Sequence, residues 1–172
     1  MTAQERRGEI LDILQKAKAP VSASALAGRL SVSRQVIVGD VALLRASGTP
    51  VSATPRGYVL STAAPEAGVR RIVACCHSAG ELEKELQIMV DNGCLVEDVI
   101  VEHPVYGQIT APLQLASRWD VEQFISRVES EEARPLSALT GGVHLHTLCC
   151  GDEDAFDRVT RQLEREGFLL RD

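Results

Sequence analysis

The 172-residue sequence predicts an α+β protein that consists of two units, and three observations support this fold class. The first 60 residues carry apolar side chains at helical spacing and end in two short apolar runs around a turn. Beyond residue 70, strand-like and helix-like segments follow in the order β-α-β-β-α-β-α, which is typical of helices on one face of a mixed or antiparallel sheet. Residues 61–70 are small or polar and include Pro65 and Gly68, so they are predicted to form a linker.

The first unit is predicted to contain three helices followed by a β-hairpin. Pro20 ends the first helix, and the hydroxyl groups of Ser22 and Ser33 are suited to cap the N-termini of the second and third helices. Gly48 supplies a C-terminal stop for the third helix, and a type I turn at residues 55–57 closes the hairpin. The expected elements are helices over residues 4–17, 22–30 and 34–47 and strands over residues 51–54 and 58–60.

This arrangement, with the tripeptide Ser31-Val32-Ser33 before the third helix, is typical of a winged helix-turn-helix, which places its third helix in the major groove of DNA. The charge distribution is consistent with a polyanionic partner. Residues 1–60 carry eight Lys or Arg against four Asp or Glu, whereas residues 61–172 carry ten against twenty. We therefore expect double-stranded DNA to bind the first unit. The alternative is a three-helix interaction module whose arginines are only solvated.

The expected DNA contacts lie at the start of the third helix and on the hairpin. Arg34 is suited to bidentate recognition of guanine and Gln35 to recognition of adenine, because these side chains match the base edges. Arg56 at the hairpin turn is expected to reach phosphate or the minor groove, and Arg45 either to reach phosphate or to cap its helix. The candidate DNA-binding residues are Ser33, Arg34, Gln35, Val38, Arg45 and Arg56.

In the second unit, strands and helices are expected to alternate over the whole length. The predicted strands cover residues 69–76, 95–103, 105–113 and 141–150, with a last short strand over 168–170. The predicted helices cover residues 79–93, 117–130 and 152–167.

The second unit contains all four histidines of the chain, His77, His103, His144 and His146. His144 and His146 are two residues apart on one strand, so they share a face with Cα atoms ~7 Å apart and can converge on one ion. His77 precedes a helix on which Glu85 lies at the rim of the buried face and Glu81 lies farther from it. Three imidazoles and a carboxylate suit zinc, nickel or another borderline divalent metal. The alternative is a set of hydrogen-bonded histidines beside a solvated acidic helix.

Composition excludes several classes of protein. Hydrophobic residues make up 45% of the chain, so a packed core is expected and wholesale disorder is not. No apolar run approaches the ~20 residues of a membrane helix, and the N-terminus lacks the apolar segment of a signal peptide. We expect a cytoplasmic protein with no membrane partner.

The five cysteines lie at positions 75, 76, 94, 149 and 150, without a CxxC spacing. In a cytoplasmic protein the expectation is reduced thiols that act as buried strand residues. A competing hypothesis is a thiol-based redox sensor, in which Cys75 or Cys76 forms a bridge between strands to Cys149 or Cys150.

Four motifs, LSVSRQVIV, ATPRGYVL, VEHPVYGQI and GGVHLHT, occur in this order, and over essentially the whole chain they resemble the niacin-responsive transcription repressors. This family joins a winged helix-turn-helix to a 3H domain, which is named for its histidines and resembles the histidine-containing phosphocarrier fold. The resemblance implies a DNA-binding domain over 1–61, a linker over 62–70 and a regulatory, metal- and effector-binding 3H domain over 71–172.

The resemblance also implies a repressor, not an enzyme. Members of the family bind operators upstream of NAD biosynthesis or niacin uptake genes, with nicotinic acid as corepressor and a divalent metal in the 3H domain. Carried onto this sequence, the metal ligands would be His77, Glu85, His144 and His146, with His103 close by as an effector contact. Arg118 is the nearest loop-like cation by sequence and a further candidate for the effector's carboxylate.

The chemistry of the implied effector agrees with such a site. A divalent ion with one glutamate and three neutral histidines has a charge of about +1, which attracts the nicotinate anion. A homodimer is expected, because dimers of helix-turn-helix proteins read two half-sites about one helical turn apart. Two alternatives remain open, namely a regulator that responds to the metal itself and a metal-dependent hydrolase fused to a DNA-binding module.

Overall fold

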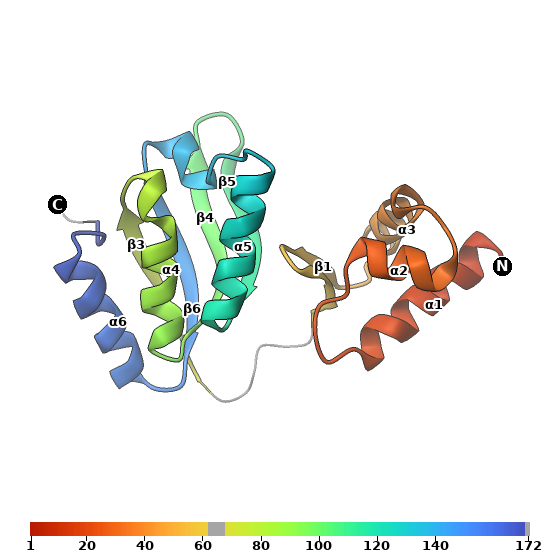
Figure 1. The fold of residues 1–172 in the computed structure, drawn as a ribbon, viewed down its shortest axis with the longest axis horizontal. Helices are drawn as coiled ribbons and strands as arrows, with labels where there is room; N and C mark the ends of the chain where they lie inside the picture. The colour runs from red at the N-terminus through yellow and green to blue at the C-terminus, as the bar shows by residue number, and fades with distance from the viewer. Residues whose placement is uncertain (62–67, 171–172) are drawn as a thin grey trace. The chain divides into compact units, whose positions relative to one another are not determined.

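The computed structural model describes residues 1–61 and 68–170 and divides the chain into two compact units, Met1–Ala64 and Pro65–Asp172 (Figure 1). Each unit has its own hydrophobic core. Residues 62–67 of the expected linker lie outside the described residues. The expected linker is too long at its C-terminal end, because residues 69 and 70 already pair in the sheet of the second unit.

The first unit contains the predicted three helices and hairpin. The helices are α1 (Ala3–Lys16), α2 (Ala23–Leu30) and α3 (Arg34–Ala46), and the hairpin pairs β1 (Val51–Thr54) with β2 (Gly57–Leu60). Each helix begins at a hydroxyl cap, because the side chains of Thr2, Ser22 and Ser33 accept a hydrogen bond from the backbone N–H three residues on. The apolar stripes of the three helices, including Ile10, Leu26 and Ile37, meet in the core.

A buried ion pair fixes α1 against α3. The carboxylate of Asp40 on α3 is only 4% exposed, and the Nε atom of Arg6 on α1 lies 2.5 Å from its Oδ2 atom. Arg7 approaches the other carboxylate oxygen at 3.4 Å. Because a buried carboxylate requires such partners, these contacts hold the middle of α3 against the N-terminal part of α1.

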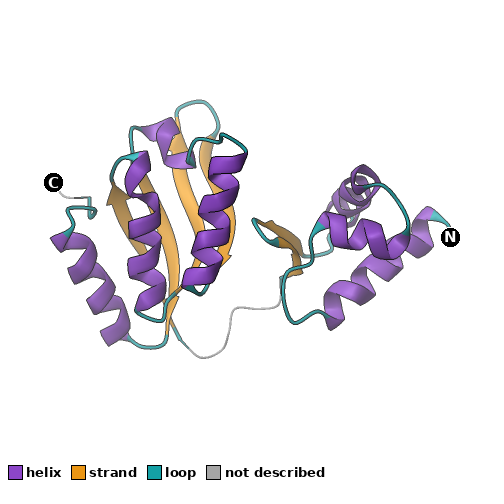
Figure 2. Ribbon diagram, in the orientation of Figure 1, coloured by secondary structure: helices purple, strands orange, loops and turns teal. Residues whose placement is uncertain are grey.

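The second unit is a four-stranded antiparallel sheet covered by three helices (Figures 1 and 2). The strands β3 (Val69–Cys76), β4 (Leu95–His103), β5 (Gly107–Leu115) and β6 (Val143–Cys150) lie in the order β3-β6-β4-β5. The helices α4 (Leu82–Asp91), α5 (Arg118–Ser130) and α6 (Glu153–Arg165) contribute to a single core with one face of the sheet. The predicted β-α-β-β-α-β-α order and the predicted helical face are both confirmed.

The structure differs from the predicted elements at several places. The predicted last strand over residues 168–170 is only an isolated bridge between Leu169 and Cys75. The strand predicted from residue 105 begins at Gly107, because the Nδ1 atom of His103 accepts hydrogen bonds from the N–H groups of Val105 and Tyr106 and closes a turn there. The helix predicted from residue 79 starts as a 3₁₀ turn, η1 (Ala79–Glu81), before α4. A second 3₁₀ helix, η2 (Leu136–Thr140), packs beside β4 and was not predicted.

The cysteines correct the expectation of reduced thiols. Cys94 and Cys150 form a disulfide, because the sheet brings their Cα atoms to 4.2 Å across 56 residues of sequence. Cys75, Cys76 and Cys149 are free. The redox hypothesis paired the wrong cysteines, since Cys75 lies opposite His144 on β6, six positions from Cys150.

No helix among the described residues combines the length and the apolar composition that crossing a membrane requires.

Candidate metal centre

Three of the four histidines converge with Glu85 at one end of the second unit. His144 and His146 point from the same face of β6, and His77 follows the last residue of β3, the neighbouring strand. Glu85 lies in the first turn of α4, which packs on that face. All four side chains are at most 2% exposed.

The carboxylate of Glu85 lies at the centre of the three imidazoles. Its Oε2 atom lies 2.7 Å from Nε2 of His77 and 3.4 Å from Nε2 of His146, and its Oε1 atom lies 2.8 Å from Nε2 of His144. The rings of His77 and His146 each lie edge-to-face against the ring of His144, with centroids 4.9 and 5.0 Å apart. The sequence placed Glu85 on the buried rim of its helix, and the structure brings it to the histidines. Glu81, in contrast, is exposed and accepts hydrogen bonds from Ser78.

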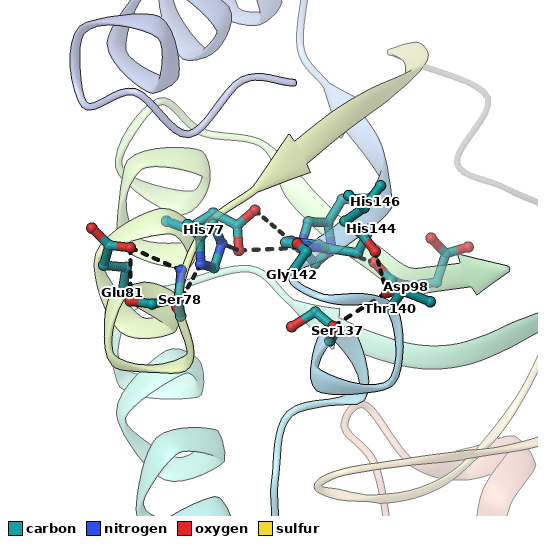
Figure 3. Close-up of polar contacts among 11 residues, drawn as sticks. His77, Ser78, Glu81, Asp98, Ser137, Thr140, Gly142, His144 and His146 are labelled. Atoms are coloured by element: carbon teal, nitrogen blue, oxygen red, sulfur yellow. Dashed lines mark hydrogen bonds and ion pairs between the residues drawn. The ribbon is translucent and has the colours of Figure 1, made fainter. Parts of the chain in front are cut away.

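The other nitrogen of each ring is held by a backbone carbonyl (Figure 3). The Nδ1 atoms of His77, His144 and His146 lie 2.7–2.8 Å from the carbonyl oxygens of Ser78, Gly142 and Asp98. A carbonyl can only accept, so each Nδ1 carries the proton and each neutral ring directs the lone pair of Nε2 at Glu85. A bulge in β4 between Val96 and Ile100 contains Asp98, which no sequence pattern pointed to.

Three lone pairs and a carboxylate that face one another require a positive charge between them. Among the described residues, the buried Nε2 atoms of His77 and His146 and Oε2 of Glu85 face only one another and have no further hydrogen-bond partner. Such buried atoms are rare in folded proteins, where burial without a partner is costly. A divalent cation would satisfy all of them at once, and outer carbonyls that fix the Nδ1–H tautomer are the usual support of metal-binding histidines. The donor set therefore fits a borderline divalent metal.

The same need for positive charge appears in the pKa values. Burial raises the pKa of Glu85, but the charge of His146 and hydrogen bonds from the three histidines outweigh it and hold this pKa well below its usual value. Burial lowers the pKa of His146, but the Glu85 carboxylate outweighs it and the net shift is upward. His77 shows the same balance. A cation at the centre would replace these protons.

The structure adds Cys75 to the cluster, a residue that the sequence analysis treated as a buried strand residue or as a redox-sensing thiol. Its Sγ atom, an oxygen of Glu85 and a ring nitrogen of His144 all lie within 4.8 Å of one another. Cys75 is 0% exposed and lies directly opposite His144 in the β3–β6 pairing. The CxH spacing of Cys75 and His77, which alternates like the HxH of β6, was the signal in the sequence that would have indicated it.

The two proposed effector contacts do not join this cluster. Arg118 forms two hydrogen bonds to Asp91, at 2.7 and 2.6 Å, and Asp91 ends α4 six residues beyond Glu85, or about 9 Å along the helix. His103 lies at the β4–β5 turn, where its ring stacks near that of Tyr106 at a centroid distance of 5.0 Å. Because the Nδ1 atom of His103 accepts two backbone N–H groups, its Nε2 carries a proton when the ring is neutral.

In the first unit, the proposed DNA-binding residues differ in exposure. Arg34, Gln35 and Arg45 on α3 are exposed, and Ser33 uses its hydroxyl to cap that helix. Val38 is half-buried and packs against the core of the first unit beside Ile37. Val36, in contrast, is exposed. Arg56 is half-buried and lines a pocket beside the α1–α2 loop instead of extending from the hairpin.

Comparison with known proteins shows what these units are. Residues 6–59 match the HTH domain family and residues 70–172 match the 3H domain family. The chain is 47% identical over 169 residues to a probable transcription repressor NiaR of Thermotoga maritima, an alignment that covers 98% of this chain and 95% of the relative. It is 45% identical over 169 residues to the transcription repressor NadR of Bacillus subtilis, covering 97% and 94%.

The chain belongs to the NiaR/NadR family of transcription repressors. The family assignment places it among repressors with a DNA-binding helix-turn-helix and not among enzymes, as the resemblance implied. The HTH match covers the elements from α1 to β2, and the 3H match contains all four histidines, Glu85 and Cys75.

In this member of the repressor family, Gly142 supports the centre. Gly142 has φ +97°, and a Cβ atom there would lie 2.6 Å from the carbonyl oxygen of His77. Its own carbonyl holds the ring of His144. We expect Gly142→Ala to displace both histidines and to weaken zinc binding, measured by competition with a chelator, by about 10–100-fold, as outer supports of metal ligands do.

The neighbouring Gly141 offers a matched control. It also has a positive φ, of +63°, but a Cβ atom there would meet nothing within 4 Å. Gly141→Ala should therefore lower the free energy of unfolding by about 1–2 kcal/mol, because alanine disfavours the left-handed conformation, and it should leave zinc affinity unchanged. Equal zinc affinity in wild type and Gly142→Ala would contradict the role assigned to this support.

Proposed function

We propose that this protein is a homodimeric repressor of NAD biosynthesis or niacin uptake genes, which binds operator DNA with nicotinic acid as corepressor and a divalent metal in its 3H domain. The observation that carries the effector part of the proposal is the buried centre of three histidines and Glu85, whose Nε2 and carboxylate atoms face one another and would all be satisfied by one cation. The names of the relatives, NiaR and NadR, point to the same regulation.

The proposed ligands of the metal are His77, Glu85, His144 and His146, and zinc or nickel suits such a mixed imidazole and carboxylate set. When bound, the metal would supply a local positive charge. With one ionised carboxylate and neutral imidazoles, a divalent ion leaves a site of about +1 in a buried environment, which favours an anionic effector such as nicotinate. Nicotinamide lacks the carboxylate, so we expect it to act more weakly.

We retain His103 as the proposed effector contact. Its two backbone hydrogen bonds fix the ring and leave the Nε2–H group as a donor, the group that a carboxylate requires. Arg118 is a weaker candidate, because two of its five N–H donors, on Nε and Nη2, already bind Asp91.

The DNA contacts are proposed on the exposed start of α3. Arg34 and Gln35 are both exposed there. Ser33 caps the helix, and Asp40 holds it against α1 through its ion pair with Arg6. Arg34 and Gln35, the two side chains best suited to recognise base edges, are therefore free to enter the major groove.

Corepression requires that nicotinic acid favour the DNA-competent state of the repressor. A ligand shifts an equilibrium only through its different affinity for the two states, and typical couplings of ~1–3 kcal/mol change affinity by ~5–150-fold. The test is a mobility-shift assay on the DNA upstream of the protein's own gene with zinc-loaded protein. Nicotinic acid should tighten binding within that range, whereas unchanged binding would contradict the corepressor assignment.

The second candidate is a regulator that responds to the metal itself. The same cluster of three histidines and Glu85 favours it, because its atoms are suited to bind a metal ion. The two functions differ in one comparison. If a chelator abolishes operator binding and zinc restores it fully without nicotinic acid, the metal is the signal.

A further inference from the structure

We propose that Cys75 is a fifth protein ligand of the metal centre, so that the site is a three-histidine, glutamate and thiolate set. This inference rests on the metal centre of the proposed function and deepens it. The proposal assigns a metal-binding role to Cys75 and none to the adjacent Cys76, which lies on the other face of the same strand.

The position of Cys75 follows from strand geometry. β3 and β6 are antiparallel, and their register places Cys75 opposite His144 and Val73 opposite His146. Because side chains alternate, Cys75 shares its face with His77, two residues later, and with both histidines of β6. That face is the one covered by α4, from which Glu85 enters the cluster.

The distances suit a shared ion. The sulfur of Cys75, an oxygen of Glu85 and a nitrogen of His144 lie within 4.8 Å of one another. Ligand atoms that bind one zinc ion at about 2.0–2.3 Å lie at most about 4.6 Å apart, so small movements suffice. Independently, the buried Nε2 atoms of His77 and His146 face the same carboxylate and have no other hydrogen-bond partner.

Binding of the thiol changes both the charge and the selectivity of the site. The S–H bond breaks, a sulfur–metal bond forms, and one proton is released to solvent. With a divalent ion, one carboxylate and one thiolate, the net charge becomes about zero instead of about +1, so an anionic effector would then be attracted by the metal ion itself and not by a net positive charge of the site. A thiolate is a soft ligand, so it favours zinc or nickel over magnesium, calcium or manganese.

X-ray absorption at the zinc edge tests this on the full-length, zinc-loaded protein. A sulfur ligand adds scattering at about 2.3 Å, beyond the about 2.0–2.2 Å of nitrogen and oxygen ligands. We expect one sulfur per zinc in the wild type and in Cys76→Ser. In Cys75→Ser we expect zinc bound by nitrogen and oxygen alone. Cys76→Ser is the matched control, because it removes a thiol from the same strand on the opposite face.

The outcomes separate the two proposals. Zinc bound without sulfur in the wild type overturns the role of Cys75 and leaves the metal centre intact. The wild type and Cys76→Ser decide this even if Cys75→Ser does not fold. A sulfur signal that persists in Cys75→Ser also overturns it. Failure of the wild-type protein to take up zinc on reconstitution overturns the metal centre of the proposed function itself.

Discussion

Glu85→Gln is expected to lower zinc affinity by more than about 100-fold, because loss of a direct ligand should exceed the 10–100-fold cost of losing an outer support. Glu85 is 0% exposed and is the only carboxylate among the described residues that contacts all three histidines. Glutamine keeps the size of the side chain but removes the charge that holds the cation. The affinity is measured by competition with a chromophoric chelator, and zinc content by elemental analysis.

The same variant should lose the response to nicotinic acid while its basal affinity for operator DNA stays nearly unchanged. Glu81→Gln is the matched control on the preceding turn. Glu81 caps the helix from an exposed position by accepting hydrogen bonds from Ser78, and glutamine preserves such a capping box. Wild-type zinc affinity in Glu85→Gln would show that the carboxylate is not a ligand.

Arg34→Ala is expected to weaken operator binding by ~1–3 kcal/mol, or about 5–150-fold, and to relax the base preference at one position of each half-site. Arg34 is exposed in the first turn of α3, where a bidentate contact with guanine is accessible. Operator affinity against single-base variants of the site measures both effects.

Arg45→Ala on the same helix provides the comparison. Arg45 is exposed in the last turn of α3, where a phosphate contact is expected. Its loss should weaken all sequences about equally and reduce the salt slope by about 1. If Arg34→Ala binds the operator as the wild type does, α3 does not read the bases as proposed.

The sequence predicted those parts of the site that depend on local periodicity. His144 and His146 share a face because strand residues alternate, and Glu85 faces inward because the angle between helix positions is fixed. The capping serines and the order of strands and helices also depend on local patterns, and the structure confirms them.

The parts that depend on register could not be predicted in the same way. The residue opposite His144 is Cys75 only because of the β3–β6 pairing, and Cys94 meets Cys150 only because β4 pairs with β6. A bulge in β4 places the carbonyl of Asp98 at His146. Arg118 looked available in the sequence, but the fold gives it Asp91 as a partner.

The central claim is that nicotinic acid, bound at a metal-loaded 3H domain, increases the affinity of the repressor for its operator. By linkage, operator DNA must increase the affinity for nicotinic acid by the same factor. Isothermal titration of nicotinic acid into zinc-loaded protein, with and without saturating operator DNA, measures this directly. We predict a ~5–150-fold tighter dissociation constant with operator present, and the same factor in the DNA titration. Equal nicotinic acid affinity in both titrations would contradict the account and favour the metal as the signal.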